Sequence, residues 1–178
     1  MTVEADPSAS ANQRRARPAR WYPRLLGLAL AVVVVDQLTK LWATAALSDG
    51  RRVAVLGELL GLRLIYNPGA AFSIGTGVTW VFAVIAAVAV VAITWVARRV
   101  GSGAWAVALG LVLGGAATHL LDRLFREPGF ARGHVVDFID YAGLFVGNVA
   151  DIGLVVGGAL IVGLHLRGVG VDGRRGGG

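Results

Sequence analysis

The chain contains no cysteine and carries few charged residues. Of its 178 residues, 16% are charged and 56% are hydrophobic, and the mean hydropathy is +0.67. Soluble domains carry about 25% charged residues. The absence of cysteine excludes disulfide scaffolds, thiolate zinc sites and a cysteine nucleophile. The scarcity of charge, with the hydrophobic residues gathered in long runs, predicts an integral membrane protein, and the length suits about one domain.

Four apolar stretches are long enough to cross a bilayer, which takes about 20 helical residues. These predicted spans are residues 25–47, 78–97, 104–121 and 141–166. Between the first two spans, apolar residues alternate over 53–55 and 60–66, which predicts short strands on the membrane surface. The segment 123–140 is expected to be a loop or a short interfacial element. The predicted fold class is therefore all-α integral membrane, with four transmembrane helices and a small extracytoplasmic β-element and loop.

The basic residues predict how the chain is oriented in the membrane. Ten of the 17 Lys and Arg residues lie before or early in the first span, between the second and third spans, or at the C-terminus, together with three of the 11 acids. Because Lys and Arg accumulate on the cytoplasmic side, both termini are expected there. We predict disordered cytoplasmic tails over 1–24 and 167–178, a membrane domain over 25–166, and no nucleic-acid partner. The first span also resembles a cleavable secretory signal, which stays an alternative.

Three aspartates lie within or at the end of predicted spans, where an isolated charge costs at least about 2.5 kcal/mol. They are Asp36, Asp122 and Asp151, and the topology places all three toward the outer face, where they could line one cavity. Two carboxylates held together share one proton and can act as acid and base on water. Lys40, four residues after Asp36, favours a structural ion pair there. Asp151 has no cation within four residues, so it is the strongest catalytic candidate.

Two alternatives compete with this hydrolytic chemistry. His119 with Asp122, and His134 with Asp137, have a spacing that helical bundles use for metal ligands, but two such pairs do not define a site. Intramembrane acids also mark ion paths, so a small transporter or proton-relay protein stays open.

Five short sequence blocks resemble the lipoprotein signal peptidase family (signal peptidase II). In chain order they are DQLTK (36–40), NPGAAFS (67–73), GGA through LDR (114–123), VVDFID (135–140) and NVAD (148–151). Five blocks in order within a four-span frame make the resemblance specific, and it covers residues 25–166. The chain departs from the family pattern in two places. Thr118-His119 stands where the family usually has Gly-Asn, and Gly147 stands where it usually has Phe.

The resemblance implies an aspartic endopeptidase of the bacterial inner or plasma membrane. Its partners would be membrane lipids and diacylglyceryl-modified prolipoproteins, whose signal peptide it would cut off before the lipid-modified cysteine. It would need no metal or organic cofactor, and a monomer is expected. The resemblance makes Asp122 and Asp151 the catalytic pair, with a supporting or substrate-contacting set of Asp36, Lys40, Asn67, Arg123, Asp137, Asn148 and His119. Because of the two departures, a catalytically altered paralogue is also an alternative.

Overall fold

The structure, a computed structural model, describes residues 21–69 and 78–175. Within these residues, four helices are long and apolar enough to cross a membrane. They are α2 (Tyr22–Ala46), α3 (Thr79–Ala97), α4 (Gly103–Phe125) and α5 (Val149–Leu166). The four predicted spans are therefore confirmed. The expected disorder of residues 1–20, and most of the second sequence block, lie outside the described residues.

Helix α2 begins at Tyr22, so residues 22–24 are helical and not part of a disordered tail as predicted. Two other helix ends differ from the prediction by four residues or more, and both differences matter for the site. Helix α4 continues past residue 121 to Phe125, so Asp122 lies inside its last turns. Helix α5 begins at Val149 rather than at residue 141. The intervening apolar run is broken by a tight turn in which Ala142 and Gly143 have φ of 55° and 73°. Positive φ at both central residues is the geometry of a type I′ turn, which joins two strands and ends any helix.

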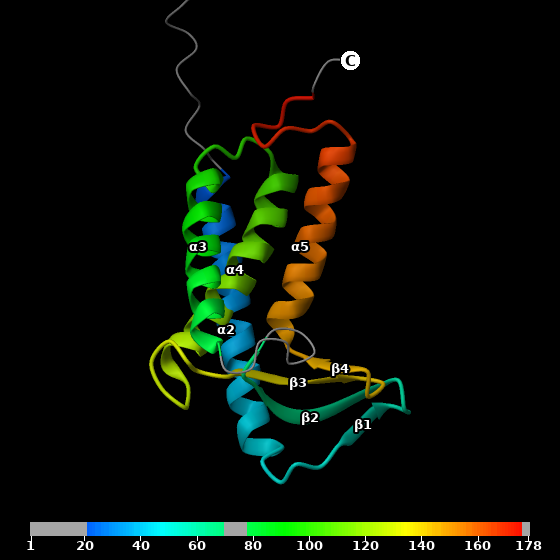
Figure 1. The fold of residues 1–178 in the computed structure, drawn as a ribbon. Coiled ribbons are helices and arrows are strands. Elements are labelled where there is room, and N and C mark those ends of the chain that lie inside the picture. The colour runs from blue at the N-terminus through cyan, green and yellow to red at the C-terminus, as the bar shows by residue number, and fades with distance from the viewer. Residues whose placement is uncertain (1–20, 70–77, 176–178) are drawn as a thin grey trace, which may run out of the picture.

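Within the described part of the chain, four antiparallel strands form one small sheet in the order β1-β2-β3-β4. They are β1 (Val53–Leu56), β2 (Leu60–Asn67), β3 (Val135–Tyr141) and β4 (Phe145–Gly147). The sheet lies across one end of the helical bundle, beside α2 (Figure 1). The predicted strands before residue 67 are confirmed, but strand β3 corrects the expectation of a loop or interfacial element over 123–140. Most residues of β3 are buried on both faces, so its sequence shows no alternation.

Helix α4 is the centre of the bundle, and the other three helices pack against it (Figure 1). Glycines allow the close approach. A Cβ added to Gly115 would lie 2.6 Å from Leu154 Cγ, and one added to Gly157 would lie 2.7 Å from Val112 Cγ2. Such close packing drives helix association in a bilayer, where lipid tails are as apolar as the side chains.

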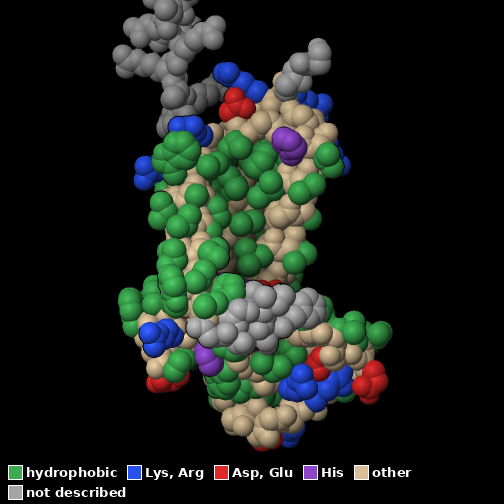
Figure 2. All heavy atoms as spheres, in the orientation of Figure 1, with side chains coloured by type: hydrophobic (Ala, Val, Ile, Leu, Met, Phe, Trp, Pro, Cys, Tyr) green, Lys and Arg blue, Asp and Glu red, His purple; other side chains and the backbone are tan. Residues whose placement is uncertain are grey.

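The start of α2, the α3–α4 link and the end of α5 share the end of the bundle opposite the sheet (Figure 1). Hydrophobic side chains cover the flank between the two ends, and Lys and Arg side chains gather at this opposite end (Figure 2). Residues 167–175, predicted to be disordered, have defined contacts instead. The N–H of Gly101 donates to the carbonyl of Val171, and the indole of Trp105 donates to that of Val169, both at 3.0 Å.

Candidate active site

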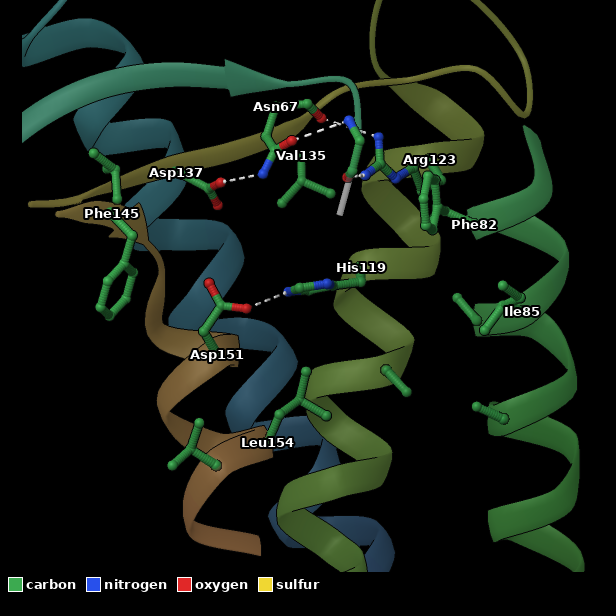
Figure 3. Close-up of a pocket in the computed structure, with 16 residues that line it drawn as sticks. Asn67, Phe82, Ile85, His119, Arg123, Val135, Asp137, Phe145, Asp151 and Leu154 are labelled. Carbon is green, nitrogen blue, oxygen red and sulfur yellow. Dashed lines mark hydrogen bonds and ion pairs between the residues drawn. The ribbon is translucent and has the colours of Figure 1, made fainter. Parts of the chain in front are cut away.

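A cavity of about 650 Å³ lies between α3 and α5, where the helices meet β3 and β4 (Figure 3). Its apolar walls come mainly from Phe82, Ile85, Ala86 and Ala89 of α3 and from Leu154 and Val155 of α5. Its polar groups gather near the sheet and are Asn67, His119, Arg123, Asp137 and Asp151. An apolar cleft with a few convergent polar groups is the usual form of a binding site for a small molecule or a reacting group.

Two carboxylates, those of Asp137 and Asp151, point into this cavity from opposite sides (Figure 3). Asn148 joins them, because its side-chain Nδ2 donates to Asp137 Oδ1 at 2.6 Å and its backbone N–H donates to Asp151 Oδ2 at 2.9 Å. Asn148 is also the N-cap of α5, and its Oδ1 accepts from the N–H of Asp151 at 3.0 Å. Asn is among the preferred N-cap residues, so helix capping itself brings the two acids together.

Asp137 is a buried carboxyl that is held by neutral donors. Only 4% of the residue is exposed, and its second oxygen accepts from Asn67 Nδ2 at 3.0 Å. Burial and, to a smaller extent, the charge of Asp151 raise the pKa of Asp137, and the amide donors of Asn67 and Asn148 oppose the rise, so that the pKa is about 6. A carboxyl that binds a proton in this range beside a second carboxylate is what a pair sharing one proton requires.

Asp122 lies elsewhere, and it is not among the residues that line the cavity. Its side chain is fully buried, and two cations hold it. Oδ2 lies 2.7 Å from Lys40 Nζ, and Oδ1 lies 2.7 Å from Arg126 Nε and accepts from Gln37 Nε2 at 2.9 Å. The expectation that all three membrane acids share one cavity is therefore corrected. The structure brings Asp151 together with Asp137, because both oxygens of Asp122 are occupied by cations outside the cavity.

Lys40 is at the centre of a buried cluster with Asp36 and Asp122, here called the Lys40 clamp. Its Nζ lies 2.6 Å from Asp36 Oδ2, so the ion pair predicted from the spacing is present. Asp36 Oδ1 accepts from the N–H of Ala150 at 2.9 Å, and Asp122 Oδ2 accepts from the N–H of Val136 at 3.3 Å. These two residues immediately precede the two cavity aspartates. The clamp therefore fixes the position of the backbone immediately before each cavity aspartate.

Arg123 and Asn67 form one rim of the cavity. Arg123 is buried, and it donates to the carbonyls of Asn67 and Gly133 at 3.0 Å each and also to the carbonyl of Gly69. Asn67 Oδ1 accepts from the N–H of Gly69 at 3.0 Å. Both residues were predicted to have supporting roles, and their contacts hold the turn after β2 against α4. Asn67 remains in contact with Asp137 as a result.

Three residues of the site were missed in the sequence. Arg126 follows Asp122 by four residues, so the same spacing that flags Lys40 and Asp36 indicates it. Gln37 and Thr118 gave no such signal, because their partners lie on other helices. Thr118 Oγ1, for example, donates to Asp36 Oδ2 at 2.6 Å.

His119, which has the spacing of a metal ligand relative to Asp122, contacts Asp151 instead. His119 Nε2 lies 3.3 Å from Asp151 Oδ1, across the cavity on another helix (Figure 3). Over residues 21–69 and 78–175, no three His, Cys, Asp or Glu side chains cluster as metal ligands would.

Comparisons with known proteins give consistent matches. A family model described as signal peptidase (SPase) II matches residues 28–167. A lipoprotein signal peptidase from Leifsonia xyli subsp. xyli is 49% identical over 149 residues, which cover 83% of this chain and 69% of that protein. Another, from Rhodococcus jostii, is 46% identical over 172 residues, which cover 96% and 85% of the two chains. A solved bacterial membrane enzyme structure is 27% identical, with a TM-score of 0.71, over 82% of this chain and 94% of that one.

Proposed function

Because the chain belongs to the signal peptidase II family, we propose that Asp137 and Asp151 are the carboxylates with which it removes signal peptides from prolipoproteins. The observation that supports this pairing is Asn148, which donates to both carboxylates at the wall of one cavity. Asp122 then becomes a positioning residue within the Lys40 clamp. The pairing of Asp122 with Asp151, which the resemblance implied, is the alternative.

The chemistry is aspartic peptide hydrolysis. Water between the two carboxyls loses a proton to the Asp151 carboxylate while its oxygen bonds to the scissile carbonyl carbon. The carbonyl oxygen receives the proton of Asp137, which gives a neutral tetrahedral diol. The C–N bond then breaks, the leaving amine takes the proton from Asp151, and a diol hydroxyl returns a proton to Asp137. One water is consumed, and the pair ends in its starting state.

The apolar walls of the cavity are evidence for a lipid-modified substrate. Ile85 and Val155 line the cavity from two helices and are also 57% and 71% exposed, so the cavity opens on the flank that faces lipid. We propose that the signal peptide and the diacylglyceryl chains enter there from the bilayer. The bond before the lipid-modified cysteine would then lie beside the two aspartates, at the level of the sheet.

The chain is a multi-pass bacterial membrane protein. We further propose that residues 25–166 are its membrane domain and that both termini are cytoplasmic, which puts the sheet and the cavity on the outer side. The asymmetry of Lys and Arg supports this orientation.

The function is tested with purified full-length protein in lipid nanodiscs and a synthetic diacylglyceryl prolipoprotein, with products identified by mass spectrometry. We expect a product that begins with the lipid-modified cysteine, and we expect D151N to lower kcat by about a thousandfold or more. An intact substrate with the parent protein, or full turnover by D151N, contradicts the proposal. Proton flux in proteoliposomes without cleavage would favour the transporter alternative.

A further inference from the structure

His119 is the side chain that contacts Asp151 from across the cavity. It comes from α4, and its Nε2 lies 3.3 Å from Asp151 Oδ1 (Figure 3). The Nε2 atom is buried and makes no hydrogen bond of good geometry with any residue in the described ranges. Within those ranges, no other acceptor competes with Asp151 for this nitrogen.

The surroundings of the two carboxyls are unequal. Asp137 receives its side-chain hydrogen bonds from two neutral amides, whereas Asp151 faces an imidazole. The other charged or titratable groups that share the cavity or act on the charge of Asp151 are Lys40 of α2, Arg123 of α4, and Asp137 and Tyr141 of β3. Lys40 is bonded within its clamp, and Arg123 donates to backbone carbonyls. His119 is therefore the basic side chain that lies within ion-pair distance of Asp151 among the described residues.

We propose that His119 is a positioning residue that assigns the two roles in the aspartate pair. As an imidazolium, it holds Asp151 in the carboxylate form that activates water, and the shared proton consequently stays on Asp137. This inference rests on the proposed pairing of Asp137 with Asp151. Its physical basis is that a cation at this distance favours the charged form of a carboxyl, and histidine is the side chain that can change its charge near neutral pH.

The coupling can be measured without turnover. Infrared spectra of the D137N protein in lipid, recorded as the pH is lowered, report when Asp151 takes up a proton, because the carboxylate bands give way to a carboxylic C=O band. We expect the D137N/H119Q protein to show this change at a higher pH, by about one pH unit, which corresponds to tenfold in proton affinity. His165, at the far end of α5, offers the matched control, and D137N/H165Q is expected to titrate like D137N. Identical titrations of D137N and D137N/H119Q would overturn the proposal.

Turnover gives a second, independent readout. We expect H119Q to lower kcat about tenfold, to leave KM within about twofold, and to change the pH profile, whereas H119K, which keeps a cation, recovers part of the loss. A wild-type kcat and pH profile in H119Q, or a change confined to KM, would overturn the role. If H119Q does not fold, the same comparison of H119K with H119N decides it. Failure of the aspartate pair is distinguishable, because D137N or D151N would then keep its activity whatever His119 does.

Discussion

At the scale of single residues, the two cavity carboxylates differ in what holds them. Neutral amides hold Asp137, which is almost fully buried, whereas Asp151 lies between a backbone N–H and an imidazole. Because neutral donors offset the desolvation of a buried carboxylate less than a cation does, the proton shared by the pair belongs on Asp137. These contacts therefore make Asp137 the acid and Asp151 the base.

The rate of hydrolysis should therefore fall as the pH rises through about 6. The pKa of Asp137 is raised from its ordinary value of 3.8 to about 6, so the folded protein keeps this proton where the unfolded chain has lost it. Its contribution to stability is fully present below 3.8 and is lost as the pH rises through 6. We expect kcat/KM, measured against pH, to decline over the same upper range, because Asp137 must carry the proton.

Removing the amide of Asn67 moves this decline in a known direction. Asn67 Nδ2 donates to Asp137 and thereby favours its charged form. We expect N67A to shift the fall in kcat/KM to higher pH. Tyr66, the neighbouring residue on β2, is 54% exposed, and Y66F serves as the control with an unchanged profile. A shift of the N67A profile to lower pH would contradict the assignment of Asp137 as the acid.

At the scale of secondary-structure elements, the site depends on how strand β3 and the start of α5 are held to the bundle. The Lys40 clamp supplies that attachment through the backbone N–H groups of Val136 and Ala150. Neither bond follows from local sequence, because each joins two different elements, with 14 positions between Asp122 and Val136 and 114 between Asp36 and Ala150.

Loss of the clamp cation should weaken the fold and the site together. K40M leaves two fully buried carboxylates without their shared partner, and we expect the free energy of unfolding to fall by about 3–5 kcal/mol. The control is R51M, which breaks an exposed pair with Asp49 that is worth about 0–1 kcal/mol. Denaturant unfolding in mixed micelles compares the two variants. If K40M and R51M are equally stable, the Lys40 clamp does not stabilise the fold.

Close helix packing is tested by two adjacent glycines on α5. A Cβ at Gly157 would lie 2.7 Å from Val112 Cγ2 and 2.8 Å from the carbonyl of Ala108, whereas one at Gly158 would meet nothing within 4 Å. We expect G157A to lower the free energy of unfolding by about 1–3 kcal/mol. G158A should have no cost, since alanine favours the helix by about 1 kcal/mol over glycine. The same loss in both variants would contradict the packing of α5 on α4.

The elements that could be predicted from sequence are those with a local pattern. Hydropathy marked the four spans, and alternation marked the strands before Asn67. Strand β3 and the true start of α5 were not found, because a strand buried on both faces reads like part of a helix. Asp151 was predicted as a catalytic candidate because no cation lies within four residues of it, and it lines the cavity. The surroundings of Asp137 depend on Asn67, which lies 70 positions away, and no spacing within one helix reveals that contact.

At the scale of the whole molecule, the orientation of the bundle decides which side the cavity serves. The absence of cysteine makes the chain a clean background for single-cysteine labelling. We expect E58C, beyond strand β1, to react with a membrane-impermeant maleimide in intact cells. R98C, in the α3–α4 link, should react only after the membrane is opened. The reverse labelling pattern would place the cavity on the cytoplasmic side.

The choice between Asp137 and Asp122 as the partner of Asp151 is central, and one comparison decides it. Turnover and unfolding are measured side by side for D137N and D122N with the lipidated prolipoprotein. We expect D137N to remain folded while kcat falls about a thousandfold or more. D122N should lose about 3–5 kcal/mol of stability, because it breaks the buried ion pairs with Lys40 and Arg126, and its folded fraction should turn over far faster than D137N. A folded D122N without activity, beside an active D137N, would contradict the assignment.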